Sequence, residues 1–136
     1  MPHRQDMRHM ESGFSLHEAD DLLYIHVRGE VTVDGLIEMV QRSRRDPAFR
    51  DGMSSVCDLR ESHGHWDYSE TQRYRDFIVH IAGVHKRRWA MVVQPGALAA
   101  MLHVIILISD QVRDVIEMQV FDHPEKARRW ARGEID

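Results

Sequence analysis

Residues 89–109 read WAMVVQPGALAAMLHVIILIS, and this stretch decides the fold. Residues 89–93 are a continuous apolar run, which is typical of a central strand covered on both faces. Pro95 and Gly96 break that run. The segment from residue 97 to about residue 109 is apolar nearly all round, which predicts a mostly buried helix. A buried strand followed at once by a buried helix indicates an α/β protein.

The pattern continues toward the C-terminus. Apolar residues alternate with Glu117 and Gln119, which predicts a strand with one polar face. Pro124 then stands in the first turn of a short helix whose inward face includes Trp130.

The N-terminal half predicts a hairpin and two more helices. Residues 14–17 and 23–28 alternate between apolar and polar side chains around a short polar link, as in two paired strands. Thr32 is a plausible N-cap for a helix that ends before Pro47. Residues 54–59 predict a short buried strand, and residues 60–68 a polar loop. The next helix then begins at Ser69, which has the capping-box spacing with Gln72.

The predicted fold is therefore α/β, in the order ββαβαβαβα, with an N-terminal hairpin followed by a mostly parallel sheet. The chain has 136 residues, which fits one domain over residues 12–136 behind a flexible leader at residues 1–11. The formal net charge of −4 argues against nucleic acid as a partner. No apolar run approaches the roughly 20 residues of a membrane span, and one cysteine, Cys57, fits a reducing, cytoplasmic location.

Basic residues gather where the predicted helices end. Helices that cross between parallel strands all point the same way, so these charges would share one rim of the sheet and complement the helix dipoles. One interpretation is that these charges only complement the helix dipoles and aid solubility. The other is that they make weak contact with an acidic partner or an anionic membrane surface. The basic residues are Arg42, Arg44, Arg45, Lys86, Arg87, Arg88, Arg128, Arg129 and Arg132.

Four segments together resemble the SpoIIAA-like superfamily, and within it the small bacterial STAS/SEC14-like proteins. They are residues 27–32 (VRGEVT), 57–60 (CDLR), 89–93 (WAMVV) and 120–130 (VFDHPEKARRW), and the likeness covers roughly residues 12–132. The resemblance implies a βα superhelix and a non-enzymatic interaction or ligand-binding domain. The anti-sigma-factor antagonists of this superfamily carry a phosphorylatable serine in an Asp-Ser-Ser-Gly-like turn. Residues 58–64 read DLRESHG instead, so we do not expect that phosphorylation switch.

The candidate ligand site lies beyond the carboxyl ends of the predicted parallel strands, where open α/β sheets tend to bind ligands. Helix N-termini there offer free N–H groups to an anion, and an arginine can add a bidentate contact. A small anionic ligand, or an acidic or phosphorylated residue of a protein partner, would suit this rim. The alternative is a solvated loop whose polar residues only cap the backbone. The candidate residues are Asp58, Arg60, His63, His65, Trp66, Asp67, Ser69 and Gly96.

Catalysis and metal binding are the alternatives at the same loop. His63, His65 and Asp67 are ligand types that zinc accepts, although their spacing matches no known site, so whether they hold a metal stays open. Cys57 lies in a predicted buried strand, where thiols are inert, and His103 is expected to be buried and hydrogen-bonded. No nucleophile elbow, phosphate loop or Cys-x-x-Cys motif occurs.

The sequence thus predicts a regulatory domain that binds a protein partner or a small anionic ligand, with no cofactor and no reaction of its own. A small enzyme and a peripheral membrane or lipid-binding module are the alternatives. The apolar segment over residues 97–109 also predicts a homodimer if part of it stays exposed.

Overall fold

A computed structural model describes residues 9–136, which form a five-stranded sheet and four helices. Two short 3₁₀ turns, Glu18–Asp20 and Asp110–Val112, complete the structure. The strands are β1 (Glu11–His17), β2 (Leu22–Glu30), β3 (Ser54–His63), β4 (Arg87–Val92) and β5 (Ile116–Phe121). The helices are α2 (Val33–Arg44), α3 (Tyr68–Ile81), α4 (Ala97–Ile108) and α5 (Pro124–Ala131).

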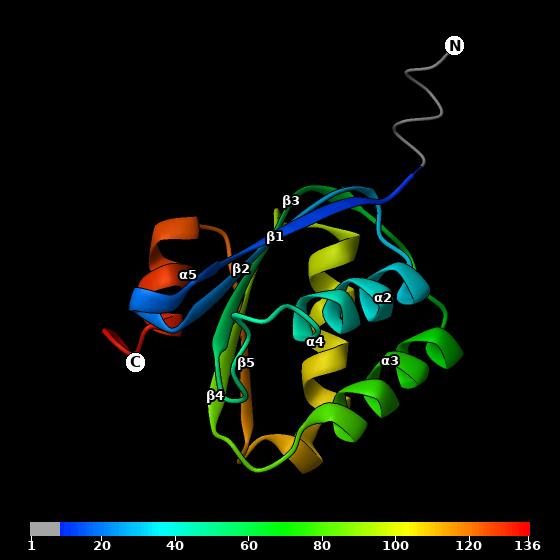
Figure 1. The fold of residues 1–136 in the computed structure, drawn as a ribbon. Helices are drawn as coiled ribbons and strands as arrows, with labels where there is room; N and C mark the ends of the chain where they lie inside the picture. The colour runs from blue at the N-terminus through cyan, green and yellow to red at the C-terminus, as the bar shows by residue number, and fades with distance from the viewer. Residues whose placement is uncertain (1–8) are drawn as a thin grey trace.

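The strands lie in the order in which they occur in the chain, from β1 at one edge to β5 at the other. β1 pairs antiparallel with β2, and the other pairs are parallel. Each crossover connection leads to the next strand on the same side, and all have the same handedness. Helices α2, α3 and α4 therefore cover one face of the sheet. Helix α5 covers the other face (Figure 1). The predicted α/β class with a mostly parallel sheet is confirmed.

Local signals placed several element ends correctly. The Thr32 hydroxyl accepts a hydrogen bond from the Gly35 N–H at 3.0 Å, as expected of an N-cap. Pro124 is the first residue of α5, where its missing N–H costs nothing. The hairpin pairs Phe14 with Ile25 and Leu16 with Leu23, so its apolar residues share one face.

Two boundaries near the candidate site were predicted wrongly. Strand β3 continues to His63 instead of ending at residue 59, because its last residues pair with the end of β2 beyond a bulge. Helix α3 begins at Tyr68, and its capping box consists of Asp67 and Glu70. Ser69 and Gln72, the predicted capping pair, lie inside the helix.

The sheet separates two apolar cores. The larger lies under α2, α3 and α4, and the smaller packs Phe121 and Trp130 between α5 and the sheet. Helix α4 is less buried than predicted, since Val104 is 40% exposed and Leu107 is 75% exposed. His103 is exposed rather than buried, because it lies on the same outer side of the helix.

The leader predicted at residues 1–11 falls mostly on residues 1–8, which lie outside the described residues, and Glu11 already belongs to β1. Among residues 9–136, no helix is both long enough and apolar enough to cross a membrane.

Candidate functional site

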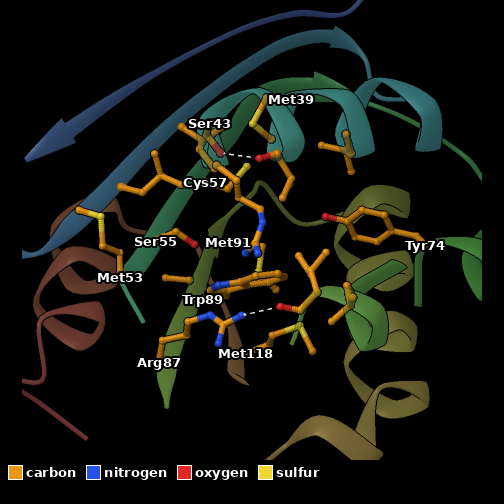
Figure 2. A pocket seen from close by; sticks show the side chains of 18 of the residues that line it. Met39, Ser43, Met53, Ser55, Cys57, Tyr74, Arg87, Trp89, Met91 and Met118 are labelled. Atoms are coloured by element: carbon orange, nitrogen blue, oxygen red, sulfur yellow. Dashed lines mark hydrogen bonds between the residues drawn. The ribbon is translucent and has the colours of Figure 1, made fainter. Parts of the chain in front are cut away.

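The larger core contains a cavity of about 80 Å³ between the sheet and helices α2, α3 and α4 (Figure 2). The cavity is lined by strands β2 to β5 on one side and by the three helices on the other. Period-two alternation turns Ser55 and Cys57 of β3 toward it, while Val56 between them faces α5. Interiors usually leave few voids larger than a water molecule, so a cavity of this size is a specific feature of the fold.

Methionine is the characteristic lining residue. The lining includes Met39 from α2, Met53 from just before β3, Met91 from β4 and Met118 from β5. Unbranched thioether side chains change rotamer easily and adapt to irregular apolar shapes. The lining can therefore adjust to guests of somewhat different shape.

Apart from the two arginines at its mouth, the polar groups at the cavity are few and neutral. Burial raises the pKa of the Cys57 thiol to about 12 and also raises that of the Tyr74 hydroxyl. Ser55 is buried beside them. A neutral hydroxyl or thiol can donate one hydrogen bond to a guest, but none of these groups brings a charge into the cavity.

Cys57 is expected to resist alkylation at about pH 8 until the protein unfolds. Raising the thiol pKa from 9.0 to about 12 lowers the fraction of reactive thiolate about a thousandfold. The rate of iodoacetamide modification, followed by mass spectrometry with and without denaturant, measures this. Equal rates in the two conditions would contradict it.

Arginine and aromatic side chains stand where the cavity approaches the surface, at the amino ends of the strands. Arg44 and Arg87 are half-buried and line it together with Phe49 and Trp89. The Arg44 guanidinium lies 5.5 Å from the Phe49 ring centroid, and that of Arg87 lies 5.9 Å from the Trp89 ring centroid. The apolar cavity therefore ends in two cations held against aromatic rings.

The structure brings two of the predicted site residues together, on the opposite face of the sheet from the cavity. The Arg60 side chain donates from Nε and Nη2 to the two carboxylate oxygens of Asp58, at 3.0 and 2.8 Å. These hydrogen bonds hold the pKa of Asp58 below its usual range. Nearby, the Gln94 amide donates to the Arg60 carbonyl at 3.4 Å, which places the turn containing Gly96 close to β3. Asp58 and Arg60 thus use their hydrogen-bonding groups on each other.

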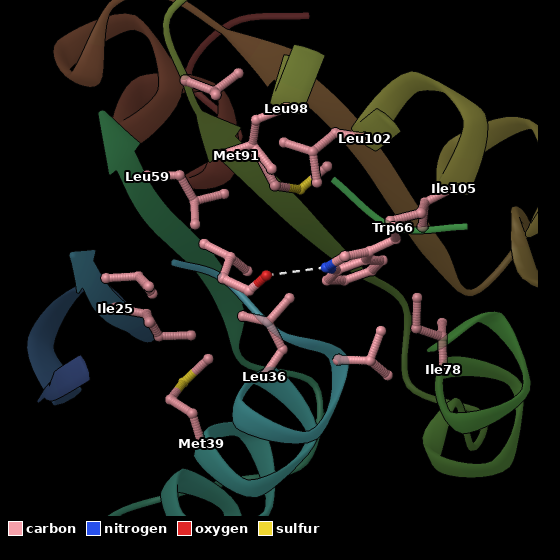
Figure 3. Packing of buried hydrophobic residues seen from close by; sticks show 14 of the residues in the cluster. Ile25, Leu36, Met39, Leu59, Trp66, Ile78, Met91, Leu98, Leu102 and Ile105 are labelled. Carbon is pink, nitrogen blue, oxygen red and sulfur yellow. Dashed lines mark hydrogen bonds between the residues drawn. The ribbon is translucent and has the colours of Figure 1, made fainter. Parts of the chain in front are cut away.

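Trp66 lies in the core rather than on a ligand-binding loop. Its indole N–H donates to the Val31 carbonyl at 2.9 Å (Figure 3), and its ring meets the edge of Tyr74 at a centroid distance of 5.6 Å. Gly64 allows this approach, because a Cβ there would stand only 3.0 Å from the Val31 carbonyl oxygen. The segment after β3 is therefore tied to the β2–α2 connection.

The remaining predicted residues are spread around the start of α3. Asp67 accepts the Glu70 N–H at 2.7 Å as an N-cap, and Ser69 is exposed in the first turn. His63 and His65 are exposed as well. Within residues 9–136, no group of three histidine, cysteine or acidic side chains is placed to hold a metal ion, so the His63, His65 and Asp67 set is not assembled.

The predicted basic rim is largely paired with acids. Five of its nine cations lie within 4.0 Å of a carboxylate. They are Arg42 with Glu38, Arg44 with Asp51, Arg88 with Glu117, Arg128 with Glu125, and Arg132 with Asp20. Exposed pairs of this kind add little stability, but they reduce the field that an anionic membrane would meet.

A second, open hollow of about 410 Å³ lies on the α5 side, between the first hairpin and α5. Most of its polar side chains bond to one another, although the buried Arg128 Nε has no hydrogen-bond partner among the described residues. Ser15 and His17 share a hydrogen bond of 3.0 Å, and Arg128 donates to Glu125 at 3.0 Å. The internal cavity is the better candidate site for an apolar ligand, because its lining is mainly apolar and it lies in the core rather than open to the surface.

A scan of the chain against protein-family models finds no match, and a search of the curated proteins finds none either.

Proposed function

We propose that this protein is a non-enzymatic binding domain that holds a small apolar group in the cavity between its sheet and α2, α3 and α4. The observation that carries the proposal is the cavity of about 80 Å³ with its adaptable methionine lining. The sequence predicted a protein partner or a small anionic ligand at the Asp58–Ser69 region; the proposal keeps a small ligand but places its apolar part in the core.

The energetic cost of the cavity supports a guest. For an enclosed cavity the cost is roughly 24 cal/mol per Å³, so about 2 kcal/mol of stability is the upper bound for a space of about 80 Å³. Typical domains have only about 5–15 kcal/mol in total. A guest that fills the void restores the missing van der Waals contacts and stabilises the folded state by mass action.

The size of the cavity limits the guest. It has about half the volume of an engineered cavity of roughly 150 Å³ that binds benzene in another protein. An aliphatic chain of about four carbons fills such a space, and a chain of about six carbons extends from it toward the mouth beside Arg44 and Arg87.

Membership of the SpoIIAA-like superfamily is part of the proposal. It is supported by the consecutive strand order with an antiparallel first hairpin, together with the four motif segments. A cytoplasmic location and a homodimer remain predictions, the latter supported by exposed Val104 and Leu107 on α4. The alternative of an enzyme built on His63, His65 and Asp67 has less support, because the Asp67 carboxylate is engaged in capping α3.

The methionine methyl groups allow a direct test. In protein labelled with ¹³C at the methionine methyls and titrated with hexan-1-ol, we expect the signals of Met39, Met53, Met91 and Met118 to shift. Met101, which does not line the cavity, serves as the internal control. Assignment by single Met→Leu variants completes the experiment, and unchanged signals from all four residues would refute the proposal.

Filling the cavity should abolish binding. Cys57→Leu places a larger side chain in the void, and we expect at least a tenfold loss of hexan-1-ol affinity in the same titration. Cys57→Ala is the matched control, because it enlarges the void and should bind at least as tightly. If Cys57→Leu fails to fold, Ser55→Val introduces a smaller obstruction at a neighbouring lining position. Retained affinity in a folded cavity-filling variant would place the guest elsewhere.

A further inference from the structure

Arg87 is fixed in place at the cavity by backbone carbonyls rather than by an acid. Its Nη1 donates to the carbonyls of Ala82 and His85, each at 2.7 Å, and its Nη2 donates to that of Ile81 at 3.4 Å. These are the free carbonyls at the end of α3 and in the following turn, which a cation suits. Among residues 9–136, no carboxylate lies within 4.0 Å of the Arg87 side chain.

One edge of the Arg87 guanidinium is left for a ligand. A guanidinium has five N–H groups, and the carbonyls use both on Nη1 and one on Nη2. The Nε–H and the second Nη2–H have no acceptor among the described residues. In Arg60 the same Nε and Nη2 atoms bind the two oxygens of Asp58. A carboxylate is therefore an anion that such an edge accepts.

The local charge favours an anion with a single negative charge. Arg44 also lines the cavity, but its charge is shared with Asp51 at 4.0 Å. Two arginines and one aspartate leave a net charge of about one positive unit beside an apolar space. Burial, followed by the nearby Arg44 cation, lowers the pKa of Arg87, so an anion there would relieve an unfavourable environment.

We propose that the guest is a short aliphatic monocarboxylate, whose chain lies among the cavity methionines and whose carboxylate binds the free Nε–Nη2 edge of Arg87 beside Arg44. The proposal rests on the proposed function, since it names the ligand class of the same cavity. Arg87 acts as the specificity-determining residue: its position is set by the carbonyls at the end of α3 and in the following turn, and its free edge distinguishes an acid from a neutral molecule of equal length.

Paired probes separate this inference from the proposed function. We expect hexanoate to bind about tenfold or more tightly than hexan-1-ol, because a charge-assisted bidentate contact is stronger than a neutral hydrogen bond. Hexyl phosphate, with its second charge, should bind more weakly than hexanoate. Affinities come from calorimetry near neutral pH, and the methionine methyl shifts place each probe in the cavity.

Variants identify the residue responsible. Arg87→Gln should bring hexanoate to the affinity of hexan-1-ol, while hexan-1-ol itself changes less than threefold. Arg87→Lys keeps the charge without the planar fork and should retain only part of the preference. Arg42→Gln is the matched control, since Arg42 lies in α2 without lining the cavity and should change neither affinity. If Arg87→Gln unfolds, as circular dichroism would show, Arg87→Lys and Arg44→Gln decide the question.

Each outcome is decisive. Equal affinity of hexanoate and hexan-1-ol in the wild-type protein would overturn the inference and leave the apolar binding function standing. A preference for hexanoate that survives unchanged in folded Arg87 and Arg44 variants would also overturn it. Failure of both probes to bind would refute the proposed function itself.

Discussion

Trp130→Ala is expected to lower the free energy of unfolding by about 3–5 kcal/mol, the usual cost of removing a fully buried tryptophan. Trp130 is 1% exposed and is the largest side chain of the core beneath α5. Its ring lies 5.4 Å from that of Phe121 by centroid distance, and the Arg88 guanidinium stands 4.9 Å from its indole centroid. Arg88 also donates to the Trp130 carbonyl at 2.8 Å.

Denaturation with urea, monitored by circular dichroism, measures this loss. Arg129→Ala is the control from the same helix, because Arg129 is exposed and surface changes usually stay within about 0.5 kcal/mol. A loss below about 1 kcal/mol for Trp130→Ala would mean that α5 is not packed against the sheet as described.

Trp66→Ala is also expected to lower the free energy of unfolding by about 3–5 kcal/mol, because it removes a different set of contacts. Trp66 is 7% exposed, and its hydrogen bond to the Val31 carbonyl joins the segment between β3 and α3 to the β2–α2 connection. Trp66→Phe keeps most of the packing but leaves that carbonyl without its donor, so about 1–3 kcal/mol should be lost. His65→Ala, at the exposed neighbouring position, should be nearly neutral.

The same variants separate a structural role of Trp66 from the ligand-binding role predicted by the sequence. Trp66 does not line the cavity, so folded Trp66→Phe should bind hexan-1-ol with wild-type affinity. Calorimetry at a temperature where both proteins are folded tests this. Unchanged stability combined with lost binding would support the ligand-binding role instead.

Local signals were sufficient where one segment alone determines a conformation. The alternation of Phe14, Leu16, Leu23 and Ile25 predicted the hairpin and the face that it buries. The start of α3 shows the limit of this reasoning. Asp67 with Glu70 and Ser69 with Gln72 both have the capping-box spacing, and only the geometry of the preceding chain selects the first.

The end of β3 depended on a distant partner. Residues 60–63 are polar and resemble a loop, yet Glu61 pairs with Arg28 and His63 with Glu30 in the sheet. Strand β4 pairs with β3 only as far as Asp58, so this last part of β3 has a single strand neighbour and can carry polar side chains. Such a pairing between distant residues leaves no periodic pattern in the segment itself.

The candidate site was harder to predict than the fold, because a cavity is formed by the spacing between elements. Each lining residue looks like an ordinary core residue in its own segment, and for Cys57 the sequence predicts only a buried, inert thiol. The one compositional signal was methionine: four of the eight methionines line the cavity. The Arg87 geometry likewise needs the carbonyls of α3, which precede it in the chain but belong to another element.

The sequence by itself determined the class of the protein. Strand and helix periodicities, turn residues and caps act over a few neighbouring positions, and together they specify an α/β chain with a hairpin and parallel crossovers. Residues 89–109, a buried strand and an apolar helix, carry the core of that prediction. Only the tertiary structure decided that three helices share one face and leave a cavity between them, because packing distances depend on all the elements at once.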